Sequence, residues 1–368
     1  MKIGFYSPLP PQRTGVADYS AALLGALRRL DEVETDARDA DVFLYHLGNN
    51  SLHQEIYARA VEQPGIVVLH DAVLQHFYLG TLDEASYIEE FVYNYGEWNR
   101  DLAADLWRSR ARSAQDARYF DYPMLRRPAE VSRAVVVHNP AAAAAVLRHA
   151  PQARVVEIPH LFVPPPAPPA VEVVRLRENW HLSAGTFLFG VFGYLRESKR
   201  LWSILDAYAR VREAGIDAAL LVAGEFVSSD LERAIAPALA RPGIVRAGFM
   251  REEDFWRAAH AVDACVNLRH PAGGETSGIT VRLMGIGKPV VTTDSGENSS
   301  YPAEVCLRVP AGVAEPGALA ECMIWLTLFP RYARRIGKHA GKWIAEHHAL
   351  DTVCARYWKL LCDLHRSY

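Results

Sequence analysis

The chain has 368 residues, of which 50% are hydrophobic and 23% charged, a composition typical of a globular protein of roughly two domains. Lysine and arginine total 40 and aspartate and glutamate 43, and the net charge of −3 argues against a general nucleic-acid-binding protein. No apolar run reaches the ~18 residues of a membrane span, and the N-terminus lacks a signal peptide's apolar core. The five cysteines show no C-x-x-C spacing, so we expect a cytoplasmic protein with reduced thiols and no metal site.

Short apolar segments rich in β-branched residues alternate with longer helical segments along the whole chain. Such short runs are typical of strands buried on both faces. The segments expected to form strands are 3–7, 42–46, 66–70, 134–138, 155–158, 187–192, 219–223, 244–247, 264–268, 290–293 and 305–309. Their alternation with helices predicts right-handed βαβ units and an α/β fold with mostly parallel strands. Because so many strands would be unusual in one sheet, we predict two sheets.

A proline-rich stretch separates the two sets of strands. Residues 159–170 read PHLFVPPPAPPA, and six of the twelve are proline, which predicts an extended connector. We therefore expect an N-terminal domain over 1–160 and a C-terminal domain over 171–345. The last segment, 346–368, carries apolar residues at helical spacing and should form an amphipathic helix that docks, with the N-terminal domain as the expected partner.

The stretch 84–130 differs from its surroundings because it is helical in pattern and rich in aromatic residues. We interpret it as an insertion between two strands of the first sheet. Two readings of its aromatic side chains stay open. They form the core of the insertion, or some of them line an acceptor cleft or touch a membrane surface.

Ligands of open parallel sheets bind at the carboxyl ends of the strands, so the loops that follow the strands are the candidate sites. In the first half, two consecutive strands end in His46 and His70, and Asp71 follows directly. Gly15 precedes a helix, where it would let the backbone approach an anion or would simply form a turn. No tight H-x-x-x-H or carboxylate set accompanies the histidines, which argues against zinc.

In the second half, the strand at 187–192 is followed by a turn at Gly193 and by three cations, Arg196, Lys199 and Arg200. Positive charge at such a loop suits a diphosphate, whose charge must be neutralised. The alternative is a solvated basic turn.

The loop GGETSG at 273–278 lies between a strand and a helix that carries Arg282. A glycine-rich loop on a helix N-terminus is suited to an anion, and the Thr276 and Ser277 hydroxyls are candidate ligands or N-caps. The carboxylate of Glu275 needs hydroxyl partners beside an anion. We therefore interpret it as a group that binds a sugar next to a phosphate.

These motifs, in this order, resemble those of the retaining nucleotide-sugar glycosyltransferases of family 4 (group 1). Gly193 and Lys199 match the family pattern Gly-Arg-x4-Lys-Gly, and 287–290 match Gly-x-Pro-Val. The GGETSG loop, the LHD at 69–71 and the HLGNN at 46–50 resemble one branch of the family. The position after Gly193 holds Tyr instead of Arg, and the second Glu of the family's Glu-x7-Glu falls on Arg282, so the ribose must be held differently.

The resemblance implies a GT-B fold, with two Rossmann-like domains that face each other across a cleft. It implies metal-independent, retaining transfer from a nucleotide-diphosphate sugar to a glycan, lipid-linked or small-molecule acceptor, without a cofactor, nucleic acid or resident metal. Peripheral membrane contact stays open. The alternative to the glycosyltransferase function is that of an inactive homologue that binds sugar nucleotides or glycans. The expected catalytic residues are Glu275, Lys199 and His70. The expected donor-binding residues are Gly15, Gly193, Arg196, Thr276, Ser277, Gly278 and Arg282.

Overall fold

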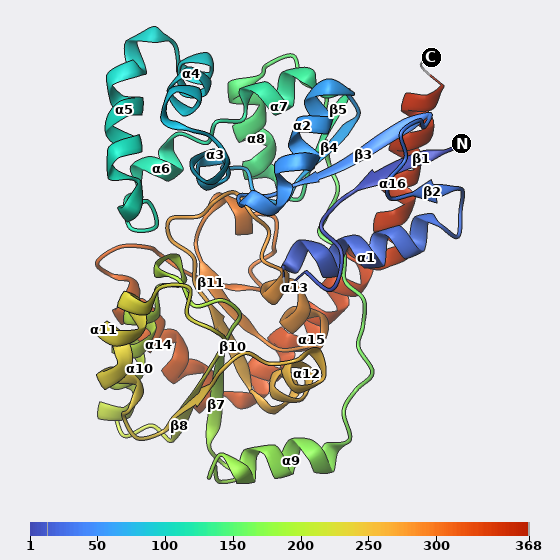
Figure 1. Ribbon diagram of the computed structural model, residues 1–368. Helices are drawn as coiled ribbons and strands as arrows, with labels where there is room; N and C mark the ends of the chain where they lie inside the picture. The colour runs from blue at the N-terminus through green and yellow to red at the C-terminus, as the bar shows by residue number, and fades with distance from the viewer. Residues whose placement is uncertain (13, 367–368) are drawn as a thin grey trace. The chain divides into compact units, whose positions relative to one another are not determined.

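The computed structural model describes residues 1–12 and 14–366 and divides into two units (Figure 1). The first unit comprises Met1–Val163, Pro271–Thr276 and His347–Tyr368, and the second comprises Pro164–His270 and Ser277–Glu346. Each unit contains a six-stranded sheet in which every neighbouring pair is parallel. The predicted α/β fold with two parallel sheets is confirmed.

The sheet of the first unit has the order β2-β1-β3-β4-β5-β6. Its strands are β1 (Ile3–Tyr6), β2 (Val33–Glu34), β3 (Val42–Leu47), β4 (Ile66–Leu69), β5 (Ala134–Val137) and β6 (Val155–Glu157). Successive residues of β3 point to opposite faces, as the pleat requires. Phe43 and Tyr45 therefore join one core cluster, while Val42 and Leu44 join another. Both faces are buried, which explains why the strands read as unbroken apolar runs.

Helices cover both faces of this sheet. The helices of the first unit before the insertion are α1 (Gly15–Leu27), η1 (Ser51–His53), α2 (Gln54–Glu62) and α3 (Gln75–Thr81), and α8 (Pro140–His149) and α16 (Leu350–His365) come after it. The C-terminal helix α16 lies against α1 (Figure 1) and shares its core cluster. It buries Tyr357, whose hydroxyl lies 2.9 Å from that of Tyr19 on α1. Residues 367–368 of the segment predicted to form this helix lie outside the described residues.

The aromatic stretch forms a group of short helices between β4 and β5. These are α4 (Glu84–Tyr95), η2 (Glu97–Asn99), α5 (Arg100–Ser109), η3 (Arg110–Arg112), α6 (Arg118–Asp121) and α7 (Arg126–Val131). Tyr87, Phe91 and Tyr119 are completely buried in the core cluster shared with the sheet. The core interpretation therefore holds for these three side chains, whereas Trp98 is fully exposed.

The sheet of the second unit has the order β12-β11-β10-β7-β8-β9. Its strands are β7 (Phe187–Phe192), β8 (Ala218–Ala223), β9 (Ile244–Ala247), β10 (Ala264–Asn267), β11 (Val290–Thr293) and β12 (Leu307–Val309). Its helices are α9 (Ala170–Asn179), η4 (Glu197–Lys199), α10 (Leu201–Glu213), α11 (Ser229–Leu239), α12 (Glu252–Ala261), α13 (Gly278–Gly285), η5 (Gly296–Asn298), α14 (Glu315–Leu328) and α15 (Pro330–His347). Within the parts of the chain that the structure describes, no helix combines the length and apolar character needed to cross a bilayer.

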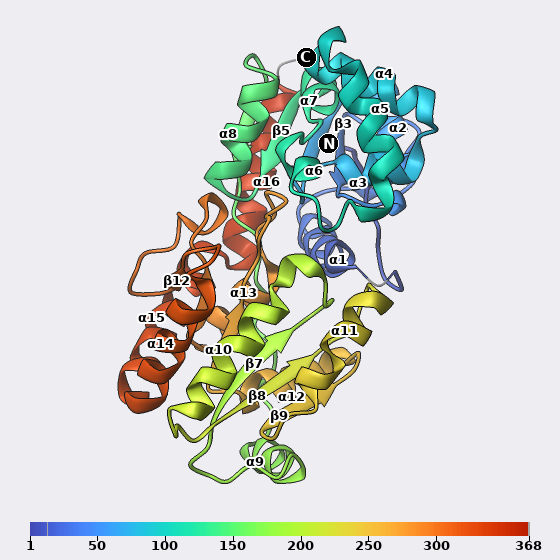
Figure 2. The same cartoon turned by 90° about the vertical axis from the view of Figure 1, so that its left-hand side faces the viewer.

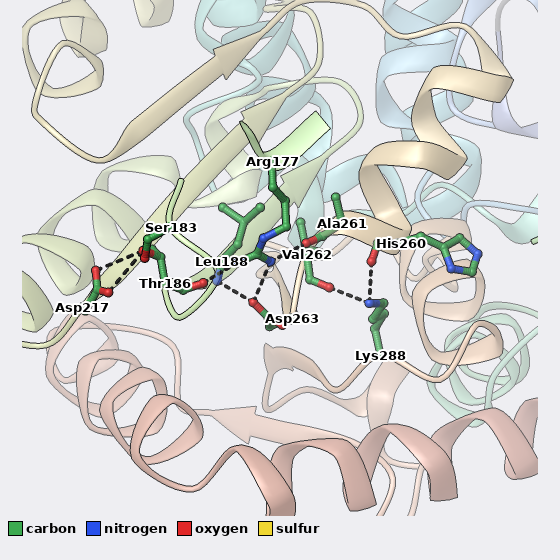
Figure 3. Close-up of polar contacts among 10 residues, drawn as sticks. All are labelled: Arg177, Ser183, Thr186, Leu188, Asp217, His260, Ala261, Val262, Asp263 and Lys288. Atoms are coloured by element: carbon green, nitrogen blue, oxygen red, sulfur yellow. Dashed lines mark hydrogen bonds and ion pairs between the residues drawn. The ribbon is translucent and has the colours of Figure 1, made fainter. Parts of the chain in front are cut away.

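A polar network fixes the amino ends of the strands in the second unit (Figure 3). Arg177 on α9 donates to the Ala261 carbonyl and to the Asp263 carboxylate at 2.8 and 3.1 Å. The ammonium of Lys288 donates to the carbonyl oxygens of His260 and Val262, at 2.8 and 2.6 Å, where α12 ends. A cation at a helix C-terminus satisfies carbonyls that have no partner within the helix. Lys288 of the Gly-Lys-Pro-Val motif therefore has a structural role.

Candidate functional site

The side chain of Lys199 lies at the carboxyl end of β7 and is only 2% exposed. Its ammonium donates to the Phe192 carbonyl at 2.9 Å and to Oδ1 of Asn267 at 2.7 Å. Both acceptors are neutral oxygens, and these two bonds hold the ammonium in one orientation. The geometry provides a fixed positive charge at the edge of the sheet where ligands of this fold class bind.

Asn267, the last residue of β10, connects this ammonium to the start of α13. Its Nδ2 donates to the hydroxyls of Ser277 and Thr280 at 2.8 and 2.7 Å. The Ser277 hydroxyl is also the N-cap of α13 and accepts from the Thr280 backbone N–H. One amide therefore positions both a cation and a helix N-terminus, which carries partial positive charge. Our sequence analysis missed Asn267, although a polar residue that ends an apolar strand is a usable signal.

Gly193 makes the turn between β7 and Lys199 and requires a left-handed backbone, with φ +89°. A Cβ at the neighbouring Gly224 would lie 1.9 Å from the carbonyl oxygen of Gly193. Two strand ends therefore approach each other more closely than any side chain would allow. This close approach accounts for Gly224, and the left-handed backbone accounts for Gly193.

The other predicted donor ligands of the second unit differ in their surroundings. Arg196 is exposed, with its guanidinium 5.9 Å from the ring centre of Tyr194. Arg282 lies on α13 with its guanidinium 5.5 Å from each of two aromatic ring centres on α12, those of Phe255 and Trp256. Gly278 is the first residue of α13. The donor-binding role of Arg196, Arg282 and Gly278 stays a prediction.

Arg200, read from the sequence with the same group of cations, pairs with the buried carboxylate of Glu315 at 2.7 Å. A buried carboxylate needs such a partner. Arg200 therefore holds η4 against α14, and the Glu315 carboxylate neutralises its charge.

The loop Pro271–Thr276 makes its contacts in the first unit. The Ala72 N–H donates to the Gly273 carbonyl at 2.8 Å, and Nδ2 of Asn139 donates to the Gly274 carbonyl at 2.9 Å. The Thr276 hydroxyl accepts from the same amide and donates to the His138 carbonyl, at 3.1 and 3.2 Å. Thr276 therefore docks the loop, whereas Ser277 alone is the N-cap.

Gly274 is required by this docking. Its φ is +75°, and a Cβ there would lie 2.5 Å from Cβ of Ala72. This close contact between loop and strand end, within the first unit, explains the glycine. The next residue, Glu275, is half-buried, and its Oε2 accepts from the Gly273 N–H at 2.8 Å. That bond turns the carboxylate back over its own loop.

His70 follows β4 and belongs to a buried group of imidazoles around the ring of Tyr19. Its Nε2 lies 2.9 Å from Nδ1 of His46, and its ring meets the edge of Tyr19 at 4.9 Å. The rings of His138 and His160 lie 5.3 and 4.9 Å from the Tyr19 ring. Burial, reinforced by the neighbouring histidines, holds the pKa of His70 well below its ordinary value. His70 is therefore neutral and acts as a hydrogen-bonding group.

His138, which we did not single out from the sequence, directly follows β5, the next strand along the sheet. Its Nδ1 faces the Ile158 carbonyl at 2.8 Å. A carbonyl only accepts, so the proton of the neutral ring sits on Nδ1 and the buried Nε2 carries a lone pair. Among the described residues that Nε2 has no hydrogen-bond partner. Burial lowers the pKa of His138 to about 4.

Two further predicted positions lie in loops of the first unit. Gly15 is the first residue of α1, exposed, with space around it for a side chain, and Thr14 is the N-cap. Asp71 accepts from the backbone N–H of Asn49 at 2.8 Å and so ties the loops after β3 and β4 together. Within residues 1–12 and 14–366 no group of three or more His, Cys, Asp or Glu side chains could hold a metal ion.

Two parallel six-stranded Rossmann-like sheets define the GT-B fold, which solved structures share along nearly their whole length. Sucrose-phosphate synthase from Thermosynechococcus elongatus is 16% identical with a TM-score of 0.70, each chain covered completely. Anabaena HepE in complex with UDP and glucose is 14% identical with a TM-score of 0.64, covering 99% of this chain and all of that one. WaaG, a glycosyltransferase involved in lipopolysaccharide biosynthesis, is 13% identical with a TM-score of 0.62, covering 98% and 99%.

Residues 186–327, most of the second unit, match the family model of the group 1 glycosyl transferases. That match and the GT-B fold indicate that the protein is a glycosyltransferase. A comparison with curated proteins gives no match. The matched range contains the Lys199–Asn267–Ser277 network and the loop with Glu275, the residues around which the sequence predicts donor binding.

Proposed function

We propose that the protein transfers a sugar, with retention of anomeric configuration and without a divalent metal, from a nucleotide-diphosphate sugar to a glycan, lipid-linked or small-molecule acceptor. The observation that supports this most directly is the Lys199 ammonium, fixed by two neutral oxygens at the carboxyl end of β7. A leaving diphosphate gains negative charge as the glycosidic bond breaks. A cation that is already oriented stabilises that charge without reorganisation.

The N-terminus of α13 is the second element proposed to receive the diphosphate. Asn267 holds it in register with Lys199, and the helix dipole favours an anion at this end. A buried ammonium and a helix N-terminus together provide the positive charge that a metal ion supplies in other enzymes. This is the basis on which we propose metal independence.

His70 and Glu275 are proposed to bind the donor sugar. His70 is neutral because burial lowers its pKa, so it exchanges hydrogen bonds with hydroxyls without adding charge. The carboxylate of Glu275 has several lone pairs, and one of them is used by the Gly273 N–H. Carboxylates accept strongly from sugar hydroxyls. The oxocarbenium-like transition state also gains from nearby negative charge.

The acceptor is proposed to be a hydroxyl-bearing carbohydrate or lipid-linked carbohydrate. HepE is bound to UDP and glucose, and WaaG is involved in lipopolysaccharide biosynthesis, which makes UDP-sugars the first donors to test. The aromatic helices α4 to α7 come directly before β5 in the chain. They offer the large apolar faces on which sugar rings stack, which supports an acceptor role for exposed members of that group.

The test is incubation of the protein with UDP-, GDP- and ADP-sugars in the presence of EDTA, with nuclear magnetic resonance to follow donor consumption and the anomeric configuration of the product. We expect slow hydrolysis or transfer of one donor class with retention. Glu275→Gln keeps the acceptor oxygen for the Gly273 N–H and should weaken binding of the sugar nucleotide more than that of the bare diphosphate. Strict metal dependence, inversion, or binding without any turnover would contradict the proposal, and the last result would favour an inactive binding homologue.

A further inference from the structure

A cluster of exposed aromatic side chains lies where α14 ends and α15 begins. The rings of Trp325, Phe329 and Tyr332 contact one another with centres 5.9 to 6.2 Å apart. Together with Leu328 they are 38% to 57% exposed. Single exposed apolar residues are ordinary on protein surfaces, whereas exposed aromatic side chains that contact one another are a candidate binding surface.

A row of cations continues from this cluster along the exposed face of α15. Spacings of three, four and seven residues place the five side chains on one face of the helix. They are Arg331, Arg334, Arg335, Lys338 and Lys342. Among the described residues, only Lys342 of these five forms an ion pair, with Glu346 at 3.7 Å. The exposed carboxylates of α14 and α15 are Glu321 and Glu346, so the row is not neutralised although the whole chain has a net charge of −3.

The opposite face of α15 fixes which side of the helix is exposed. It consists mainly of small buried residues, among them Ala333, Gly337 and Ala340. A Cβ at Gly337 would lie 2.0 Å from the carbonyl oxygen of Gly287, so the two backbones are in direct contact. Rotation of the helix would break this close packing. Helices α14 and α15 lie at the outer edge of the second unit (Figure 2). The exposed cations and the aromatic cluster, together the α14–α15 surface, lie on the sides of these helices that the buried residues leave open to solvent.

We propose that the α14–α15 surface binds peripherally to a lipid bilayer that contains anionic lipids. Lysine and arginine are attracted to acidic headgroups, and tryptophan, tyrosine and phenylalanine settle at the boundary between headgroups and acyl chains. The juxtaposition of unneutralised cations with exposed Trp325, Leu328 and Phe329 matches this boundary. A nucleic acid would use the cations but not Leu328, and a protein partner would favour the apolar cluster but not a long row of like charges. The inference goes beyond the proposed function and does not rest on it.

The test uses flotation of the full chain with phosphatidylcholine vesicles that contain either no acidic lipid or about one-third phosphatidylserine. We expect binding only to the acidic vesicles. The variant Arg331→Gln, Arg334→Gln, Lys338→Gln should bind about a hundredfold more weakly, since each cation near the surface contributes about fivefold. The matched control is Arg233→Gln, Arg241→Gln, Arg251→Gln, which removes three exposed arginines elsewhere in the second unit and should bind like the parent protein.

A second measurement locates the aromatic cluster. Lipids brominated in the acyl chain should quench part of the tryptophan fluorescence, and Trp325→Phe should abolish that part. Equal loss of binding in both triple variants, equal binding to both kinds of vesicle, or unchanged quenching in Trp325→Phe would each overturn the proposal. The proposal would also be overturned if the parent protein bound no vesicles and substitutions in the α14–α15 surface changed its oligomeric state. That result would assign the surface to a protein partner.

Discussion

Replacing Asn267 by aspartate should add a negative charge beside Lys199 while the shape of the side chain stays the same. Asparagine and aspartate have the same shape, and the Ser277 and Thr280 hydroxyls, which now accept from Nδ2, can rotate to donate to a carboxylate. The hydrogen-bonded network is then kept. The ammonium, 2.7 Å from this position, then lies beside an added negative charge, which opposes the binding of a diphosphate.

The expected size of this effect follows from Coulomb's law. A negative charge within roughly 7 Å of a bound diphosphate opposes binding by about 2 kcal/mol at an effective dielectric constant near 20, a loss of affinity of about 30-fold or more. Asn267→Ala should behave in the opposite way. It removes one bond to a charged donor and two to hydroxyls, which lowers the free energy of unfolding by about 3 to 5 kcal/mol but leaves the positive charge in place.

Titration calorimetry with UDP, GDP and ADP and thermal unfolding of each variant measure the two quantities. Asn267→Asp should weaken diphosphate binding with little change in the unfolding temperature. Asn267→Ala should lower that temperature while the folded protein keeps more of its affinity than Asn267→Asp does. If the aspartate variant bound diphosphates as well as the parent protein, the role assigned to the Lys199 charge would be refuted.

Other predictions concern the first unit. Gly274→Ala should release the loop from Ala72, because the new Cβ would lie 2.5 Å from that of Ala72 and the backbone φ is +75°. Limited proteolysis should then cleave the loop. Gly273→Ala is the control and should stay resistant, because its new Cβ would contact only the flexible Glu275 carboxylate, at 3.0 Å. Burial lowers the pKa values of His53, His138 and His348 to about 4, so between about pH 6.5 and pH 4 the unfolded chain binds protons that the folded unit does not. Stability should therefore be full above about pH 6.5 and fall towards pH 4, by up to about 3 kcal/mol for each group. Unfolding temperatures recorded across this range check the sign, and His138→Gln should make the dependence less steep; a flat or rising profile on acidification would contradict it.

The sequence predicted those features that depend on residues close together in the chain. Apolar runs between helical segments indicated both sheets, since hydrophobic periodicity is local. The same holds for α16, whose buried face follows helical spacing. The strand β2 was missed because it has only two residues, Val33 and Glu34, too few to show a period.

The features that the sequence could not indicate depend on contacts between distant residues. Asn267 is 68 residues from Lys199 in the chain, and the residues around Asn267 carry no pattern that predicts its contact with Lys199. Gly274 looked like part of an anion-binding loop, but its left-handed backbone serves the approach to Ala72, about two hundred residues earlier. Lys288 belonged to a motif of the resembling family, yet its role at the end of α12 appears only once the helix and the loop are folded.

Lys199 and Lys288 together permit the most direct test of donor binding. Both ammonium groups donate to two oxygens within the second unit, Lys199 at the carboxyl end of β7 and Lys288 before the first residue of β11. Calorimetric titration of Lys199→Met and Lys288→Met with UDP, GDP and ADP in EDTA compares them. We predict that Lys199→Met loses about 10- to 100-fold in affinity for the diphosphate that the parent binds, and that Lys288→Met keeps that affinity while unfolding at a lower temperature. Unchanged binding by Lys199→Met, or equal loss in both variants, would contradict the assignment of the diphosphate to Lys199.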